Sequence, residues 1–462
     1  MPPVFRRIIT LICLALVTLA PFRAATAQQG QRLNLIRDAE IESTIRTFTI
    51  PIWRAAGLDP NGVEIMLVQD NSLNAFVAGG QRIFINTGLI MRTERPNQLI
   101  GVMAHESGHI AGGHLARMQE ELRSLSTLQI LETILAGGAM AGGALGGGSG
   151  GVGGPAGSGG MGGRTGAPGS LMSFLKYTQT QESAADQAAI SYLQRTGQSP
   201  SGTVEFLRIL QREEKLAINR RDPYLSTHPL TPERIAAFEE AARNSPYLKT
   251  PDTPQALMLH QRMVAKLYGF VAPDVALSRY AEGDRSVPAR YARAIALYRK
   301  GALGSALLTI DGLLKEYPND GYFHEVKGQM LYENGRAGES IASYKRAVQL
   351  LPSADIIKVD YARALLDTNN PDNDREAVRN LELARLQESG SFELWRLTAS
   401  AYSKLNNPGM TSLARAEMAA LRGQRAEAQS HAEAAARQLQ AGTPAWQRAQ
   451  DLKAYINSRP RR

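Results

Sequence analysis

The spacing of apolar and polar residues predicts helices on both sides of a short β region in the first part of the chain. Residues 28 to about 58 have the spacing of an amphipathic helix. Apolar residues then alternate in "VEIMLVQD" and "NAFVAGGQRIFINTG", and the turn residues 77–81 between two such runs are typical of a β-hairpin. Pro96 and Asn97 open the next helix, for which Asn97 is the expected N-cap.

After further predicted helices from about residue 171 to 247, the helical pattern repeats. Small, large and helix-breaking residues recur every 34 residues: Ala294 with Gly328, Leu297 with Leu331, Gly301 with Gly335, Ala306 with Ser340, Ile310 with Tyr344, Leu313 with Ala347, and Pro318 with Pro352. Looser copies follow through Ala362 and Leu365, then Trp395 and Tyr402. Unrelated amphipathic helices would not keep this register. The period predicts tetratricopeptide repeats.

These patterns divide the chain into regions. A first domain with a small β-hairpin or sheet is expected over residues 28–250, followed by a linker rich in Pro and Asp over 251–286. An α-solenoid of tetratricopeptide repeats is expected over 287–442, and a basic C-terminal tail over 443–462. The predicted fold class is mostly α.

The N-terminus has the three parts of a secretory signal peptide over residues 1–27. Arg6 and Arg7 precede an apolar run that is short for a membrane span, and residues 25–27 are Ala-Thr-Ala. An uncleaved anchor is the alternative. Cys13, the only cysteine, lies in the apolar run, so a cleaved chain would have no disulfides and would build a metal site from His, Asp and Glu.

Charge and composition exclude some function classes and leave others open. The net charge of +9 falls to +6 without Arg6, Arg7 and Arg23, and no basic stripe alternates with aromatic residues, so nucleic-acid binding is not expected. Residues 137–170 hold 18 of the 43 glycines and should be mobile, either as a spacer or as a flap over a site. The apolar stretch before them could contact a membrane surface.

The stretch "VMAHESGHIAGGHLA", residues 102–116, carries the candidate chemistry. Residues four apart on a helix differ by about 40° in direction, so His105 and His109 can reach one ion. Glu106 lies about 100° from His105, where it can accept a proton from a water but is badly placed to bind the ion. This is the zincin arrangement, with one Zn²⁺ per chain.

The third ligand must come from elsewhere in the chain. His114 lies about 140° from the ligand face, which favours a supporting role. Glu182 in "QESAADQAA" is the better candidate, and Asp186, one turn later, could hydrogen-bond a ligand histidine.

His228, in "YLSTHPLTPERIAAF", has two interpretations. It could stabilise the oxyanion of the reaction, or it could fill the open position of the zinc and close the site. Arg234 follows six residues later. The remaining histidines, His260, His324 and His431, are expected to be solvent or packing residues.

Taken in order, HESGHxxxxH, ESAAD and THPLTPER between a signal peptide and tetratricopeptide repeats resemble one peptidase family over essentially the whole mature chain. That family also holds the CAAX prenyl protease and the membrane heat-shock protease. The resemblance implies zinc bound by His105, His109 and Glu182, with Glu106 as base, Asp186 as an assisting acid and His228 as a regulatory fourth ligand. It also implies a periplasmic location, degradation or rescue of stalled outer-membrane proteins, and repeats that dock onto the outer-membrane assembly machinery. The long glycine-rich run departs from a well-formed lid helix.

The sequence therefore predicts a zinc metalloendopeptidase joined to a helical repeat scaffold. Its substrates would be unfolded or misassembled proteins, bound in extended form along the edge of the hairpin around residues 76–85. Two alternatives stay open. One is a chaperone or assembly adaptor with a closed or vestigial protease site, and the other is a pure repeat adaptor.

Overall fold

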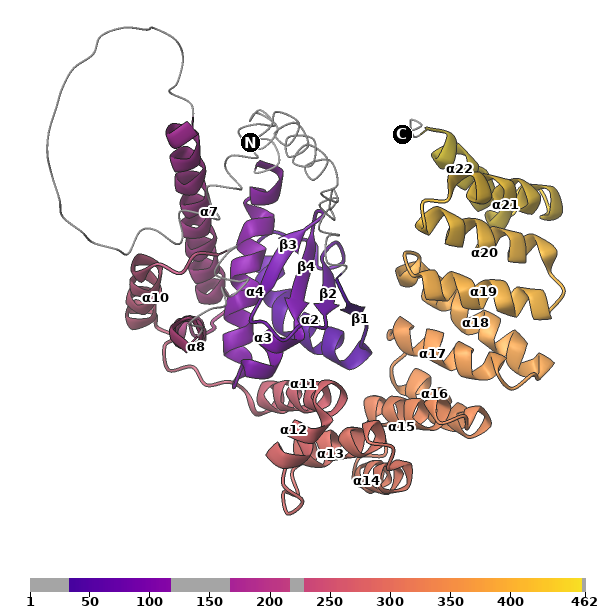
Figure 1. Ribbon diagram of the computed structural model, residues 1–462, viewed down its shortest axis with the longest axis horizontal. Coiled ribbons are helices and arrows are strands. Elements are labelled where there is room, and N and C mark those ends of the chain that lie inside the picture. Colours follow the sequence, from indigo (N-terminus) through magenta and orange to yellow (C-terminus); the bar gives the residue numbers. More distant parts are fainter. Residues whose placement is uncertain (1–32, 118–166, 217–227, 459–462) are drawn as a thin grey trace, which may run out of the picture. The chain divides into compact units, whose positions relative to one another are not determined.

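The computed structural model describes residues 33–117, 167–216 and 228–458 (Figure 1). The chain divides into a short N-terminal unit, residues 1–35, and a large unit, residues 36–462. The described residues are mostly helical with one small sheet, which confirms the predicted fold class.

The sheet has four strands in the order β1-β2-β4-β3. These are β1 (Leu35–Ile36), β2 (Glu64–Val68), β3 (Ala75–Ala78) and β4 (Arg82–Asn86). The predicted hairpin is present, because β3 pairs antiparallel with β4, and Gly79 and Gly80 supply the positive φ angles of its turn. However, β4 also pairs in parallel with β2. Of the two hairpin strands, only β3 therefore has an open edge, while β4 lies inside the sheet.

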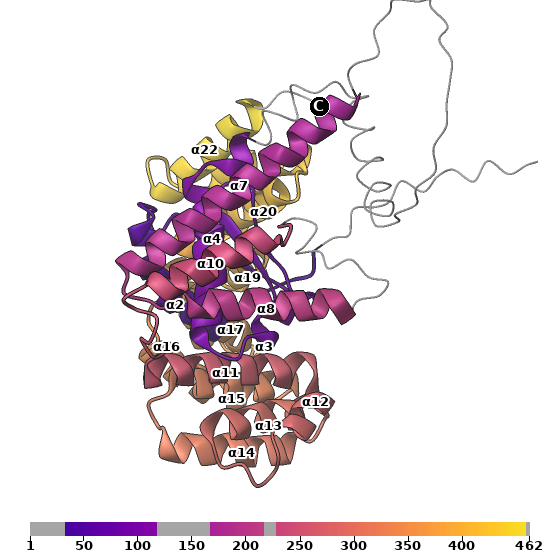
Figure 2. The same ribbon diagram turned by 90° about the vertical axis from the view of Figure 1, so that its left-hand side faces the viewer.

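Helices surround this sheet and form the first hydrophobic core with it. They are α2 (Ala39–Ala55), α3 (Thr87–Arg92), α4 (Pro96–Ala111), α7 (Ala167–Arg195), α8 (Ser201–Leu216) and α10 (Pro232–Asn244). The core includes fully buried Trp53, Leu67 and Met103. Its central helix is α4, which packs against α2, α7 and α8 (Figures 1 and 2).

Glycines let the helices approach α4 closely. A Cβ at Gly101 would lie 2.2 Å from the Oγ1 atom of Thr203 in α8. A Cβ at Gly108 would lie 2.9 Å from the carbonyl oxygen of Ala185 in α7. Because no side chain intervenes, α7 can bring its own side chains next to those of α4.

Two predicted helix starts are wrong. Residues 33–38 are not helical, and α2 begins at Ala39, because Asp38 caps it by accepting a hydrogen bond from the Ile41 amide at 2.9 Å; residues 28–32 lie outside the described ranges. Pro96 occupies the first turn of α4, so Asn97 is not its cap. The Asn97 side chain instead accepts a hydrogen bond from the Gly202 amide at 3.0 Å.

The stretch 251–286, expected to be a linker, contains α11 (Pro254–Val271) and α12 (Pro273–Arg279). Met263, Val264 and Leu267 of α11 belong to the first core. The prolines that suggested a linker stand at the starts of these helices, where the missing amide hydrogen bond costs nothing.

The repeats form a series of helical pairs with cores of their own. The pairs are α13 (Val287–Arg299) with α14 (Leu303–Glu316), α15 (Gly321–Glu333) with α16 (Ala337–Leu350), α17 (Asp355–Leu366) with α18 (Pro371–Glu388), α19 (Phe392–Lys404) with α20 (Pro408–Leu421), and α21 (Arg425–Gln438) with α22 (Pro444–Ser458). The basic tail expected from residue 443 is therefore largely helix α22. Its Leu452 and Ile456 are buried in the core of the last pair.

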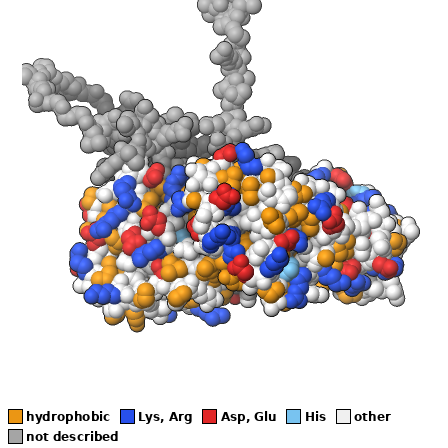
Figure 3. Space-filling model, turned by 90° about the horizontal axis from the view of Figure 1, so that it is seen from below, with side chains coloured by type: hydrophobic (Ala, Val, Ile, Leu, Met, Phe, Trp, Pro, Cys, Tyr) orange, Lys and Arg blue, Asp and Glu red, His pale blue; other side chains and the backbone are white. Residues whose placement is uncertain are grey.

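Several predictions fall on residues that the structure does not describe. The signal peptide, residues 1–27, and the glycine-rich segment up to residue 166 lie outside the described ranges, whereas residues 167–170 already belong to α7. Within the described ranges, no helix has an apolar stretch long enough to cross a bilayer. On the face seen in Figure 3, basic, acidic and hydrophobic side chains are interspersed.

Candidate metal centre

Two imidazoles from one face of α4 begin the centre. His105 and His109 are one helical turn apart, and their Nε2 atoms lie 3.1 Å from each other. Burial lowers the pKa of His109 to about 4, which leaves a neutral ring with a free lone pair at neutral pH. The two rings can thus direct one nitrogen each at the same point.

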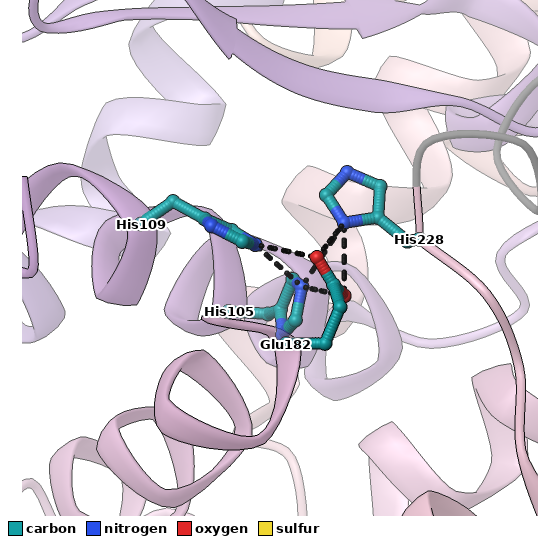
Figure 4. A group of neighbouring side chains, drawn as sticks. All are labelled: His105, His109, Glu182 and His228. Carbon is teal, nitrogen blue, oxygen red and sulfur yellow. Dashed lines mark hydrogen bonds and ion pairs between the residues drawn. The ribbon is translucent and has the colours of Figure 1, made fainter. Parts of the chain in front are cut away.

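Glu182 of α7 completes a set of three donors. Its Oε2 lies 3.3 Å from the Nε2 of His105, and its Oε1 lies 3.3 Å from the Nε2 of His109 (Figure 4). Burial opposes ionisation, but hydrogen bonds from the histidines lower the pKa of Glu182 well below its usual range. The carboxylate is therefore charged, as a metal ligand must be.

His228 is the fourth member of the group. Its Nδ1 lies 3.0 Å and 3.1 Å from the two oxygens of Glu182 and 3.4 Å from the Nε2 of His105 (Figure 4). One ligand atom from each of the four residues lies within 4.8 Å of all the others. His228 is 5% exposed, so this imidazole is inside the centre and not on the surface.

Glu106 lies beside this group. It is fully buried, and its Oε1 lies 3.6 Å from the Nε2 of His228. Neither oxygen has a hydrogen-bond partner among the described residues, and burial raises the pKa of Glu106. A buried carboxylate of this kind is costly unless something else binds it, such as a water or a reacting group.

Asp186 and Arg234 support the donors from behind. Asp186 lies 2.9 Å from the Nδ1 of His105, which turns the Nε2 of that ring toward Glu182. Burial alone would lower the pKa of His105, but the contacts with the carboxylates of Asp186 and Glu182 raise it to about 10. Arg234 donates to Asp186 at 2.6 Å and 2.8 Å, and its Nη1 lies 3.1 Å from Glu182.

Arg234 also donates to the Pro229 carbonyl at 3.0 Å, so it connects the His228 segment to two residues of α7. The sequence pattern alone assigns Arg234 no role. The H-P-x-x-x-x-R spacing places Arg234 six residues after His228. This spacing does not show which carboxylates of another segment the guanidinium contacts.

His114 lies behind His109. The two Nδ1 atoms are 3.0 Å apart, on the side of the His109 ring that faces away from Glu182. The expected supporting position of His114 is thus the one observed. His260 is buried and contacts the Oγ1 of Thr93 at 2.8 Å, whereas His324 and His431 have only local partners in the structure.

The donor set fits a divalent metal. Two imidazoles and one carboxylate are a common zinc ligand set, and the neighbouring Glu106 is a buried carboxylate in need of a partner. This combination of an H-E-x-x-H helix with a further carboxylate is that of a metallopeptidase site.

Comparison with known proteins agrees. Residues 36–242 match Peptidase family M48, and residues 291–355 match a tetratricopeptide repeat family. The chain thus contains an M48 peptidase domain followed by tetratricopeptide repeats, and it is a metallopeptidase.

Its relatives include two proteins named beta-barrel assembly-enhancing protease. The one from Escherichia coli (strain K12) is 26% identical over 428 residues, which is 88% of this chain and 81% of the relative. The one from Yersinia pestis is 24% identical over 371 residues, which is 78% of this chain and 72% of the relative. The chain is homologous to these proteases across both of its regions.

Proposed function

We propose that the protein is a zinc-dependent endopeptidase of the periplasm that degrades misfolded or stalled outer-membrane proteins and assists their assembly. The observation that carries the proposal is the convergence of His105, His109 and Glu182 beside the buried carboxylate of Glu106. The names of the relatives support the link to β-barrel proteins, and the signal-like N-terminus supports the location.

His105, His109 and Glu182 would hold the zinc. When bound, zinc polarises a peptide carbonyl and makes a water more acidic. Glu106 would accept a proton from the attacking water as the new C–O bond forms, and would then pass this proton to the amide nitrogen, so that the peptide C–N bond breaks and the amine departs. The raised pKa of Glu106 suits this task, since a group that takes up a proton and then returns it works best when its pKa is close to the pH of the reaction.

Asp186 acts on the reaction through His105. Its Oδ1 lies 2.9 Å from the Nδ1 of His105 and favours a proton on that nitrogen, so the metal would replace the proton that the raised pKa of His105 otherwise keeps on Nε2. Arg234 in turn keeps Asp186 ionised and in place, because its guanidinium donates to both carboxylate oxygens.

Two roles remain for His228, and the geometry favours restraint. Its Nδ1 lies within 3.4 Å of the donor atoms of both Glu182 and His105, in the space that a substrate carbonyl or water would need. A group in that position excludes substrate until it moves. This supports, as a second candidate, a chaperone or assembly adaptor whose protease site is closed at rest.

The substrate would bind as an extended strand along β3. This is an edge strand of the sheet and the open edge of the hairpin, and β3 contacts α4, which carries His105 and His109. Hydrogen bonds to the main chain of β3 would hold many different sequences. Such loose preference suits a protease of misfolded proteins, while the repeats would recruit the assembly machinery.

The test is metal analysis of the mature chain together with casein cleavage, with and without a chelator. We expect about one zinc per chain and cleavage that the chelator stops and added zinc restores. Cleavage that survives full metal removal would contradict the proposal.

His228→Ala separates the two roles of that residue. If His228 restrains the site, casein cleavage at equal zinc content rises. If it only donates to the oxyanion, the same change lowers the rate by roughly 10²–10³.

A further inference from the structure

An apolar row crosses the sheet on the face turned away from the first core. Met66 of β2 is the register partner of Phe84 of β4, and Phe84 is the partner of Phe76 of β3. All of these side chains are half-buried, and none belongs to the first core or to the residues packed against it. Their neighbours Ile83 and Ile85 do belong to that core. Because successive side chains of a strand point to opposite faces, we call Met66, Phe84 and Phe76 the outer row.

The two rings of the outer row are stacked. The ring centroids of Phe76 and Phe84 lie 4.9 Å apart, and their planes differ by 3°. Neighbouring strands of a sheet are about 4.7–4.9 Å apart, so the stack advances by one ring per strand. Phe76 stands on the edge strand, and within the described ranges its ring stacks on no other ring than that of Phe84. The side of Phe76 that faces the open edge can therefore take another ring.

A substrate strand along the open edge of β3 would extend the outer row. Side chains directly opposite each other on neighbouring strands project from the same face, so the substrate residue opposite Phe76 would lie beside its ring. The substrate residues before and after it would point to the other face, where α4 packs on the sheet and carries His105 and His109. One substrate side chain would thus contact the row while its neighbours face the helix of the metal centre.

The outer row is only one residue wide along each strand. Two residues before Phe84 on the same face is Arg82, which pairs with Glu64 at 2.8 Å. On β3, the positions two residues from Phe76 are the short side chains of Asn74 and Ala78. The row therefore favours a large apolar side chain at one substrate position and not at the positions two residues away.

We propose that the outer row is a specificity site, which favours an aromatic side chain at the substrate residue opposite Phe76. The inference rests on the proposed binding of substrate along β3 and adds one preferred position to an otherwise loose preference. Stacked aromatic pairs have centroids about 4.5–7 Å apart, so a Phe or Tyr would continue the row at its existing spacing. Strands of outer-membrane barrels alternate apolar and polar residues and carry aromatic girdles, so they offer such a residue on one face.

Binding of two peptides tests the preference. Both are fluorescein-labelled nonapeptides of threonine and glutamine, with Phe at the centre of one and Ser at the centre of the other. The full chain carrying Glu106→Gln, saturated with zinc, keeps the peptides uncut while fluorescence anisotropy follows binding. The Phe peptide should bind about two- to tenfold more tightly, the range for one aromatic pair. Equal affinities would overturn the proposal, as would no binding of either peptide.

Variants of the row locate the preference. Phe76→Thr should remove most of the advantage of the Phe peptide, and Phe84→Thr should reduce it, because Phe84 supports the ring of Phe76. Threonine is common in strands, so the edge itself should persist. Tyr317→Thr is the matched control, since Tyr317 is an exposed aromatic residue of the repeats. An advantage that survives Phe76→Thr would refute the site, and thermal unfolding reports whether each variant is folded.

The position of the cut gives a second readout with the unaltered chain. When the Phe is moved along the peptide one residue at a time, the cleaved bond should move with it, because the distance from Phe76 to the metal centre is fixed. Mass spectrometry of the products locates the bond. A bond that keeps its distance from the peptide ends, whatever the place of the Phe, would contradict the proposal.

Casein cleavage by the unaltered chain keeps the two proposals apart. A chain that cleaves casein but binds the two peptides equally overturns the specificity site alone. A chain that prefers the Phe peptide but never cleaves casein overturns the proposed peptidase function alone.

Discussion

Two buried polar clusters of the large unit differ in what holds their charges together. At the metal centre, His105, His109, Glu182 and His228 bring nitrogen and oxygen donors within 4.8 Å of one another. In the second cluster, the ammonium of Lys266 lies 2.9 Å from Asp38, 3.2 Å from Glu325 and 3.5 Å from Glu40. A lysine thus takes the central position that a metal ion would take in the first.

The pKa directions follow from this difference. Burial alone would lower the pKa of Lys266, but the surrounding carboxylates raise it well above its ordinary value, so the charge is permanent. At the metal centre, burial lowers the pKa of His109 to about 4 and leaves a neutral donor. Because Lys266 already neutralises the carboxylates of its cluster, that cluster has a structural role and links α2, α11 and α15. The imidazoles and the carboxylate of the metal centre can instead bind an ion that takes part in a reaction.

The largest effect should come from Glu106→Gln. Zinc should stay bound, because Glu106 is not among the proposed ligands, while casein cleavage falls by roughly 10²–10⁴ with the loss of the base. His105→Ala should lose both zinc and cleavage. Elemental analysis and a cleavage assay check the pair, and full activity of the Glu106→Gln chain would refute the assigned base.

Next in size is Lys266→Met. Removing the central cation leaves Asp38 and Glu325 without their buried partner, while Glu40 keeps Arg262 at 2.7 Å, and this should lower the free energy of unfolding by about 3–5 kcal/mol. Denaturant unfolding measures it. The control is Lys300→Met, since Lys300 and Asp274 form an exposed pair that should contribute less than about 1 kcal/mol. An equal loss of unfolding free energy in the two variants would show that the buried cluster contributes no more to stability than an exposed ion pair does.

The next prediction concerns the pH dependence of stability at His260, a buried histidine whose pKa is lowered by burial alone. Burial lowers the pKa of His260 to about 4, below the unfolded value of about 6.5. As the pH falls, the unfolded chain binds this proton first, so the stabilisation is present above pH 6.5 or so and is lost between about 6.5 and 4. The loss should reach up to about 3 kcal/mol.

His260→Gln should flatten the pH dependence of unfolding in that window, with His324→Gln, a change at a partly exposed histidine, as the control. An unchanged slope in the His260 variant would exclude this residue as the source.

The smallest effect is expected for His114→Ala. The Nδ1 of His114 lies 3.0 Å from the Nδ1 of His109 and outside the group of four donors, so its loss should weaken zinc binding by about 10–100-fold without emptying the site at saturating zinc. Glu182→Ala should instead lower bound zinc sharply under the same conditions. Competition with a chelator of known affinity measures both, and the reverse order would exchange the roles of the two residues.

Local periodicity accounts for the features that the sequence alone could predict. His105 and His109 share a face because residues four apart on any α-helix do, and the 34-residue repeat is visible because each repeat packs mainly on its neighbours. The hairpin at Gly79 and Gly80 is equally local, since two adjacent glycines satisfy its turn.

Contacts between distant segments had to come from the tertiary structure. Gly108 lets α7 approach α4 so that Glu182 reaches the two histidines, and Arg234 ties Asp186 to the segment of His228. The pairing of β4 with β2 leaves β3 as the open edge of the hairpin. Side-chain periodicity shows which face of an element is apolar, but not which other element covers it. That depends on packing among residues far apart in the chain, which decided the Lys266 cluster, the folded α11 and the arrangement of the metal centre.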